Sequence, residues 1–272
     1  MIREIYDLKE EGVSIYSSLN ENQLKRIYEP NLGIFIAESF NVIERAMDAG
    51  YIPESFLVDE AKWERARELT GRFPEADIYR APTEVISRLT GFPLTGGILS
   101  AMKRKPLSHY KTLIENSRNI AVLTDIENPT NIGAIFRSAA ALGMDSVILS
   151  PDSCDSLYRR AIRVSMGSVF QIPWTVISKE DWKTELFEVL RHSGFTTAAT
   201  ALTKDCISIK EMSGQWGEKT AVFLGSEGYG LPEDIIEQCD QRVMIPRCNG
   251  VDSLNVAAAS AVIFWEIMRN EQ

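Results

Sequence analysis

Along residues 33–102, segments with two different spacings of apolar and polar positions alternate with each other. Short apolar runs typical of strands alternate with longer segments in which apolar residues recur at helical spacing. Glycine follows these helical segments at Gly50, Gly71 and Gly91, where helices commonly end. The pattern predicts a small α/β unit with strands at 33–37, 55–59, 76–79 and 96–102 and helices at 39–50, 60–72 and 81–91.

A second stretch, from residue 119 onward, alternates in the same way. It predicts strands at 119–126, 145–150, 169–177, 195–200, 220–225 and 242–246, and helices at 131–143, 156–167, 180–194, 232–238 and 254–270. Apolar strands between helices indicate a mostly parallel sheet covered on both faces. A basic run, a proline and only a short apolar stretch mark 106–118 as a linker. We therefore expect an α/β protein with domains at 1–105 and 119–272.

Charge and composition narrow the classes of partner. The net charge of −9 opposes the Lys/Arg excess that is usual in nucleic-acid-binding proteins. Arg159, Arg160 and Arg163 form a local basic cluster, for which a solvated helix face is the alternative. The charged N-terminal residues and the lack of a long apolar run argue against a signal peptide and a membrane span.

Cysteine and histidine spacing excludes the common metal sites. The four cysteines have no CxxC spacing and the two histidines are isolated, so no zinc site can be assembled from them. Scattered free thiols fit a reducing compartment. These features predict a soluble cytoplasmic protein without a metal or a membrane anchor.

Three segments, 128–143, 223–232 and 245–266, place polar residues and glycines where apolar strands stop. Open α/β sheets bind ligands at such strand ends. In GSEGYG, Gly225, Gly228 and Gly230 do not have the spacing of a dinucleotide fingerprint, and the P-loop lysine is missing, which disfavours a nucleotide-dependent oxidoreductase. The loop can instead approach a flat ligand with bare backbone, although a glycine-rich turn with nothing bound would look the same.

The flanking segments supply side-chain candidates. Asn131 occupies a predicted helix N-cap, and Arg137 is the lone charge of an apolar helix, where it requires an anionic partner, an open site or a solvated face. Ser253 is expected to cap the last helix. Asn255 would then lie in its first turn with no capping role, which makes it a candidate for the site.

Together these segments resemble the SpoU/TrmH family of RNA ribose 2′-O-methyltransferases, which are knotted SPOUT enzymes. The resemblance rests on three ordered motifs: Asn131, Gly133, Ala134, Ile135 and Arg137; Gly225, Glu227, Gly230 and Leu231; and Ile245, Pro246, Ser253, Leu254, Asn255 and Val256. It implies a trefoil knot, a homodimer with an active site built from both subunits, and an N-terminal RNA-recognition domain. True knots are rare, so nothing in the periodicity predicts one.

The resemblance also implies a cofactor and roles for residues. S-adenosylmethionine is expected in a pocket made by Leu224, Gly225, Gly230, Ile245, Pro246 and Leu254. Catalysis is expected from Arg137, with Asn131, Glu227, Ser253 and Asn255 ordering it, the RNA or the cofactor. Because guanidinium keeps its proton at neutral pH, we favour Arg137 as a ligand of phosphate and of the developing alkoxide rather than as a base.

One departure from the family pattern concerns the third motif. Many relatives read Ile-Pro-Met followed by glycine two residues later, whereas Arg247 takes the methionine position and Gly250 lies one residue too far. Arg247 is expected to contact RNA or to be solvated, and Arg247→Met to lower RNA affinity more than cofactor affinity. The expected function is 2′-O-methylation of RNA, with rRNA favoured over tRNA. The alternative is a non-catalytic RNA-binding or ribosome-assembly protein of the same fold.

Overall fold

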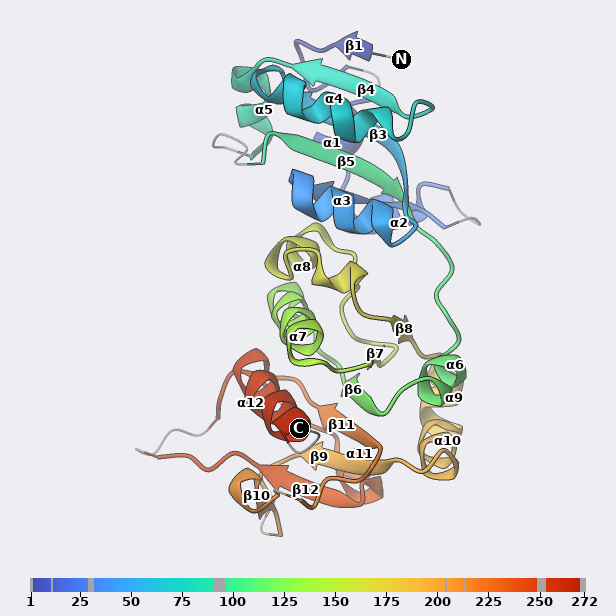
Figure 1. Cartoon of the computed structure of the whole chain (residues 1–272), viewed down its shortest axis with the longest axis vertical. Helices are drawn as coiled ribbons and strands as arrows, with labels where there is room; N and C mark the ends of the chain where they lie inside the picture. Colours follow the sequence, from blue (N-terminus) through green and yellow to red (C-terminus); the bar gives the residue numbers. More distant parts are fainter. Residues whose placement is uncertain are drawn as a thin grey trace. The chain divides into compact units, whose positions relative to one another are not determined.

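The computed structural model describes residues 2–10, 12–28, 32–90, 96–203, 205–212, 214–248 and 253–269 (Figure 1). The chain divides into two compact units. Unit 1 contains Met1–Pro106 and Leu157–Phe170, and unit 2 contains Leu107–Ser156 and Gln171–Gln272. Residues 157–170, which the sequence pattern places in the second domain, therefore pack with the first unit.

Unit 1 is built on a mixed sheet. Its strands are β1 (Ile2–Glu4), β2 (Ile34–Glu38), β3 (Ile52–Asp59), β4 (Asp77–Ala81) and β5 (Ile98–Lys103). Its helices are α1 (Ser14–Ser17), α2 (Glu21–Arg26), α3 (Phe40–Asp48), α4 (Trp63–Gly71), α5 (Thr83–Thr90) and α8 (Arg159–Val164). Within the described ranges the strands form a five-stranded sheet in the order β1-β4-β3-β5-β2, with β5 antiparallel to both neighbours.

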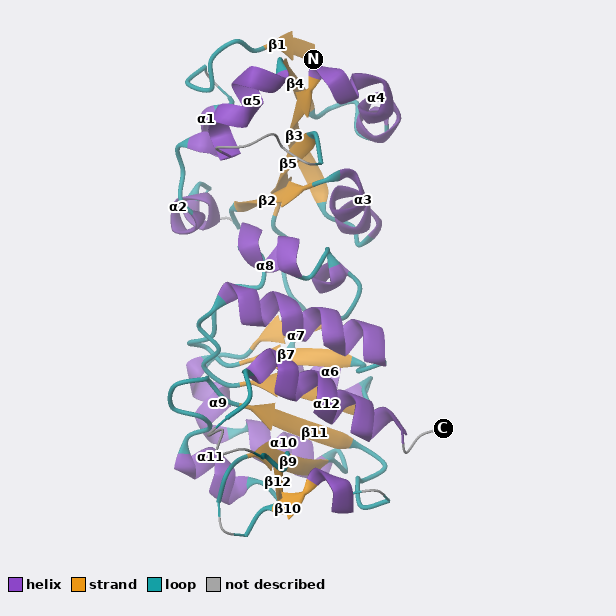
Figure 2. Cartoon of the chain, turned by 90° about the vertical axis from the view of Figure 1, so that its left-hand side faces the viewer, coloured by secondary structure: helices purple, strands orange, loops and turns teal. Residues whose placement is uncertain are grey.

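Helices cover both faces of this sheet (Figure 2). Val13, Tyr16 and Leu24 of the N-terminal helical region pack with Ile86 of α5 against one face of the strands. The sequence pattern did not predict α1 and α2. At the edge strand β2, Glu38 accepts a hydrogen bond from Arg159 of α8 at 3.0 Å, so the first arginine of the predicted basic cluster is paired within unit 1.

Unit 2 carries the second alternating pattern. Its strands are β6 (Asn119–Leu123), β7 (Ser146–Leu149), β8 (Trp174–Val176), β9 (Thr196–Thr200), β10 (Ile207–Ser208), β11 (Thr220–Leu224) and β12 (Gln241–Met244). Its helices are α6 (Tyr110–Glu115), α7 (Pro129–Leu142), α9 (Lys179–Thr184), α10 (Leu186–His192), α11 (Glu233–Gln238) and α12 (Val256–Arg269). Short 3-10 helices at Glu60–Lys62 and Ser168–Phe170 belong to unit 1, and one at Ile209–Glu211 belongs to unit 2.

The described strands of unit 2 form a seven-stranded sheet in the order β10-β12-β9-β11-β6-β7-β8. Every pairing is parallel, which confirms the predicted mostly parallel sheet. Strands β6 and β11 are buried along their full length, as expected where helices cover both faces. The predicted strand at 169–177 is shorter than expected, because a 3-10 helix occupies Ser168–Phe170 and β8 begins only after Pro173.

Residues 106–118, predicted to be a linker, contain helix α6. Tyr110, Leu113 and Ile114 are buried in a hydrophobic cluster with residues of α10, α11, β6 and β11. A short apolar stretch is therefore enough to dock one small helix onto an existing sheet. On the other face, α7 and α12 pack against each other (Figure 1).

Candidate functional site

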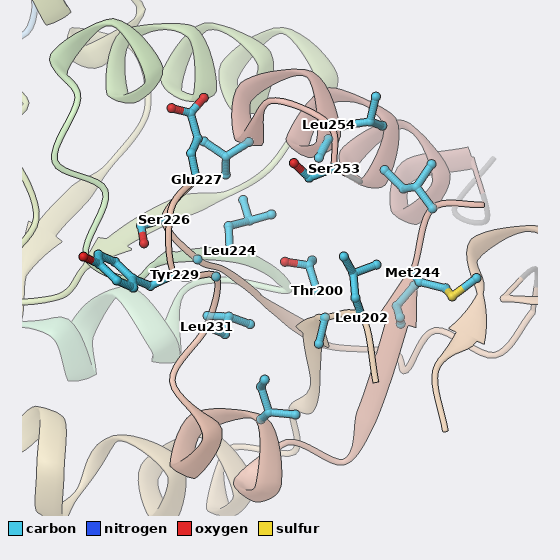
Figure 3. Close-up of a pocket in the computed structure, with 18 of the residues that line it drawn as sticks. Thr200, Leu202, Leu224, Ser226, Glu227, Tyr229, Leu231, Met244, Ser253 and Leu254 are labelled. Atoms are coloured by element: carbon cyan, nitrogen blue, oxygen red, sulfur yellow. The ribbon is translucent and has the colours of Figure 1, made fainter. Parts of the chain in front are cut away.

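The carboxyl ends of three parallel strands surround a cavity of about 480 Å³ in unit 2 (Figure 3). Strands β9, β11 and β12 end at Thr200, Leu224 and Met244, and residues at and after these ends line the space. In parallel strands these ends meet at one edge of the sheet, which is the usual ligand position in open α/β folds. The cavity therefore lies where two of the three sequence segments, 223–232 and 245–266, predicted a site.

Five of the six predicted cofactor-binding residues line this cavity: Leu224, Gly225, Gly230, Ile245 and Leu254. Pro246 is not among the lining residues. In Figure 3, Leu202, Leu224, Leu231 and Leu254 surround a common space with Thr200 at its side. The walls are thus largely apolar with a few polar groups, as is usual for small-molecule sites.

The GSEGYG loop is held closed by its own backbone. A Cβ atom at position 225 would lie 2.3 Å from the carbonyl carbon of Gly230, so only glycine fits there. The Gly230 amide donates to the Ser226 carbonyl at 2.9 Å, and Gly230 has a positive φ of 70°. Two glycines are therefore needed for this tight turn, which fixes the positions of Glu227 and Tyr229 between them.

Asn255 joins the three sequence segments. Its Nδ2 donates to Oδ1 of Asn131 at 3.2 Å and also to Oε1 of Glu227. Asn131 comes from the first motif, Glu227 from the second and Asn255 from the third. Three of the five predicted catalytic residues therefore form one hydrogen-bonded cluster, of which Glu227 lines the cavity.

The predicted caps of the two helices were both wrong. Asn128, rather than Asn131, caps α7: its side chain accepts from the Thr130 amide, and Pro129 takes the first helical position. Asn131 is consequently one turn inside the helix and only 6% exposed. Its side-chain amide does not cap α7 and instead accepts a hydrogen bond from Asn255.

At α12, Asn255 takes the role that the sequence assigned to Ser253. The Asn255 Oδ1 accepts from the Ala257 amide at 2.9 Å, and its carbonyl accepts from the Ala259 amide. This is the geometry of an N-cap residue. Ser253 instead lines the cavity, where Figure 3 shows it beside Leu254. Asn255 thus caps the helix with its oxygen and holds the cluster with its nitrogen.

Arg137 does not join this cluster within one chain. Its neighbours Ile135 and Phe136 are fully buried, whereas Arg137 is exposed and lines neither cavity of the site. Of the surroundings that the sequence left open for Arg137, a single chain provides the solvated face, and no anionic partner occurs among the described residues.

Arg247 is exposed but also lines the cavity. The structure therefore adds the cavity at the ends of β9, β11 and β12 to the two surroundings, RNA and solvent, that the sequence suggested for Arg247. Gly250, the other half of the departure from the family pattern, lies outside the described residues.

A second cavity, of about 530 Å³, lies on the other side of the GSEGYG loop. Residues 226–230 line both cavities, so the loop separates them. Asn131 and Val256 also contribute to the second cavity, together with Asp125, Glu127 and Asp152.

Sequence reasoning missed several lining residues. Thr200, Leu202 and Thr203 follow β9, and Asp125 and Asp152 follow β6 and β7. Their position just after apolar strands was the available signal, since the ligand site of a parallel sheet draws on every neighbouring strand end. Tyr229 was also missed.

No helix in the described part of the chain is long and apolar enough to cross a membrane. Nor does any group of three His, Cys, Asp or Glu residues suited to a metal occur among the residues that the structure describes.

Comparison with known proteins connects this site to one family. The profile of the SpoU rRNA Methylase family matches residues 118–265. A protein of Mycobacterium tuberculosis (strain H37Rv), described as an uncharacterized tRNA/rRNA methyltransferase, is 33% identical over 99% of this chain and 92% of its own length. The 23S rRNA (guanosine-2′-O-)-methyltransferase RlmB of Acinetobacter baylyi is 26% identical over 78% of this chain and 85% of its own.

Two solved structures show the same fold along most of the chain. The SpoU methyltransferase AviRb from Streptomyces viridochromogenes, in complex with AdoMet, has a TM-score of 0.77 at 26% identity and covers 95% of this chain and 96% of that one. An AdoMet-bound rRNA methyltransferase from Sinorhizobium meliloti has a TM-score of 0.82 at 21% identity, with 100% and 99% covered.

Proposed function

The chain belongs to the SpoU rRNA methylase family and is an S-adenosylmethionine-dependent RNA 2′-O-ribose methyltransferase, and from this premise we propose that its substrate is ribosomal RNA. The family description and the name of the related RlmB, a 23S rRNA methyltransferase, support rRNA over tRNA. The observation that carries the proposal is the hydrogen-bonded cluster of Asn131, Glu227 and Asn255, in which Glu227 lines the cavity.

The first cavity suits the cofactor. Its volume of about 480 Å³ is in the usual range for small-molecule sites, and Leu224 and Leu254 offer apolar walls to an adenosyl group. A Cβ atom at residue 225 would collide with the backbone of Gly230 and Leu231, so the loop keeps its backbone close to the ligand space. When bound, S-adenosylmethionine supplies an electrophilic methyl group on a sulfonium.

The side chains of the protein then contribute by aligning the reactants. Asn255 fixes both Asn131 and Glu227, and because Asn255 also caps α12, the cluster is tied to a rigid helix. Ser253 and Leu254, which directly precede this cap in the chain, line the first cavity. We propose that these residues orient a ribose 2′-hydroxyl toward the cofactor cavity, since holding reactants in line supplies much of the rate in such transfers.

Arg137 is proposed to bind the adjacent phosphate and to stabilise the developing alkoxide. Guanidinium stays protonated at neutral pH and therefore cannot serve as a base. Since Arg137 lines neither cavity of its own chain, its role requires that a second copy bring it to the site.

A homodimer is therefore part of the proposal. The outer face of α12 exposes Val262 and Trp265, the latter to 60%, and α12 packs against α7, which carries Arg137. Exposed apolar side chains grouped on a helix commonly mark an interface. A mixing experiment with the inactive Arg137→Ala and Asn255→Ser proteins tests whether each active site uses residues of both subunits. Recovery of activity in the mixture supports a shared site, and no recovery under conditions of subunit exchange contradicts it.

We also propose the trefoil knot. Helix α12 follows β12 in the chain but packs on α7 and β11, although β9 lies between β12 and β11 in the sheet. A return of the chain across neighbouring strands is consistent with the threading that the family implies.

The proposed compartment is the cytoplasm, which the four free cysteines support. Unit 1 is proposed to recognise RNA, on the basis of its resemblance to the domain that precedes the catalytic domain in this family.

The experiment that tests the proposed function supplies labelled S-adenosylmethionine to the protein with separated rRNA and tRNA fractions from a strain lacking the gene. Label in rRNA that maps to a ribose 2′-oxygen supports the proposal. Label in tRNA alone would show that the substrate is tRNA rather than rRNA. Cofactor binding without transfer to either fraction would favour the non-catalytic RNA-binding alternative.

A further inference from the structure

Tyr229 is the most exposed large hydrophobic side chain of the described residues, at 99% of its accessible surface. It lies at the tip of the GSEGYG loop, two residues beyond Glu227, and lines both cavities. A fully exposed aromatic ring buries no apolar surface and stabilises no fold, so its position at the site suggests a role in binding.

The loop presents this ring rigidly. Gly225 packs against Gly230 with no room for a side chain, and Glu227 is bonded to Asn255. The residues on either side of the ring are glycines, and a Cβ atom at Gly228 or Gly230 would meet no atom within 4 Å. The contacts of Gly225 and Glu227 therefore hold the turn in place, while the space beside the Tyr229 ring is open.

The ring does not belong to the apolar wall of the cofactor cavity. In Figure 3 its side chain points away from Leu224 and Leu254, on the opposite side of the loop. That side is where the second cavity lies, between the loop and the ends of β6 and β7.

The second cavity is lined by hydrogen-bond acceptors. Its charged lining residues are all carboxylates, from Asp125, Glu127, Asp152 and Glu227, and none of its described lining residues is Lys or Arg. Asp152 is paired with Lys179, which lies outside the lining. Asp125 is held in place: it has a positive φ of 53°, and Ser150 donates to its carboxylate at 2.8 Å.

This chemistry selects the ligand. A phosphate would be repelled by the carboxylates, and no group of three ligands suited to a metal exists among the described residues. A neutral, flat group with N–H donors fits both the open aromatic ring and the acceptors. Guanine fits best, because its adjacent N1–H and N2–H groups can both donate to one carboxylate, whereas uracil has a single N–H donor.

Resting on the proposed function, we propose that Tyr229 stacks on the target nucleobase and that the second cavity accepts the donor edge of that base, with guanine preferred over uracil. The base is thereby held on one side of the loop while the cofactor cavity lies on the other. The ribose then falls beside Glu227, Asn131 and Asn255. Tyr229 acts as a positioning residue for the 2′-hydroxyl.

The test uses the full chain saturated with S-adenosylhomocysteine and fluorescein-labelled RNA pentamers UUGUU and UUUUU, read by anisotropy. UUGUU is expected to bind more tightly than UUUUU. Tyr229→Ala is expected to weaken UUGUU binding about tenfold, since stacking of one base contributes on the order of 1.4 kcal/mol. Tyr229→Phe keeps the ring and should bind within about twofold of wild type.

Val176→Ala is the control, because Val176 is an exposed apolar residue of unit 2 that lines neither cavity. Its removal should leave UUGUU binding unchanged. The proposal is overturned if wild-type protein does not bind UUGUU, if UUUUU binds as tightly, or if Tyr229→Ala binds like wild type. These outcomes do not depend on methyl transfer. Binding as predicted without transfer to any RNA would overturn the proposed function alone.

In the transfer assay, Tyr229→Ala should raise the KM for RNA and leave the Kd for S-adenosylmethionine unchanged. A merely structural role would instead weaken cofactor binding as well, since residues 226–230 also line that cavity.

Discussion

The Asn255 side chain donates to Asn131 at 3.2 Å across 124 positions of sequence. Asn131 lies inside α7 and Asn255 caps α12, so this bond connects the ends of two helices that pack together. Because Asn255 also donates to Glu227, a single amide group orders one residue from each of the other two motifs. The cluster therefore depends on the packing of α7 with α12.

Two substitutions separate the two roles of Asn255. Serine can still cap α12 but lacks the amide that reaches Asn131 and Glu227, whereas alanine lacks both functions. We expect Asn255→Ser and Asn255→Ala to lower kcat to a similar degree, by about 100-fold. Only Asn255→Ala should lose about 1 kcal/mol of unfolding free energy, measured by urea denaturation. Near wild-type turnover in Asn255→Ser would contradict the positioning role.

Gly225 and Gly228 form a matched pair in one loop. Alanine at 225 would place its Cβ 2.3 Å from Gly230, whereas alanine at 228 meets no atom within 4 Å. Gly225→Ala is therefore expected to cost about 1–3 kcal/mol of stability and to weaken cofactor binding. Gly228→Ala should stay within about 0.5 kcal/mol of wild type. Thermal unfolding and calorimetry with S-adenosylmethionine measure both, and equal stability of the two variants would show that the loop can open freely.

Arg137 offers the sharpest separation between binding and chemistry. Since it lines neither cavity, Arg137→Ala should leave cofactor Kd within about twofold of wild type while kcat falls by about 100- to 1000-fold. Arg137→Lys keeps the charge but not the planar donor fork and should recover only part of the rate. Single-turnover assays measure the chemical step. Unchanged turnover in Arg137→Ala would remove Arg137 from the mechanism.

The structure changes the expectation for Arg247. From the sequence, Arg247→Met was expected to affect RNA binding more than cofactor binding, but Arg247 lines the cofactor cavity. An exposed guanidinium there can pair with the carboxylate of S-adenosylmethionine. Arg247→Met should therefore raise cofactor Kd about 2- to 5-fold at low salt, with a smaller effect at high salt. Arg247→Lys is the charge-preserving control. A larger effect on RNA affinity than on cofactor affinity would restore the original expectation.

The sequence predicted the parallel sheet of unit 2 because its strands are apolar on both faces, and that pattern has few other solutions. The resemblance to the SpoU/TrmH family implied that Leu224, Gly225 and Leu254 share one pocket, and all three line the same cavity. Caps were harder to predict. Asn128 and Asn131 are both plausible N-cap residues, and only the position of Pro129 in the folded helix decides between them.

Other features depended on tertiary packing and had no local signal. Helix α8 has the composition of any helix in the second alternating pattern, yet it packs with unit 1, where Arg159 meets Glu38. Helix α6 was too short to be distinguished from a linker, because its apolar residues gain their partners only from distant strands and helices. Tyr229 was not predicted as a site residue, because the exposure of its side chain cannot be read from the sequence.

The central claim is that this chain methylates a ribose 2′-hydroxyl of rRNA through the cluster that Asn255 assembles. The most direct measurement compares wild-type protein with Asn255→Ser on rRNA from a strain lacking the gene, using labelled S-adenosylmethionine and mapping 2′-O-methyl positions. The account predicts a ribose methyl group at a defined rRNA nucleotide with wild type and its near absence with Asn255→Ser. Label on a base, or equal labelling by both proteins, would contradict it.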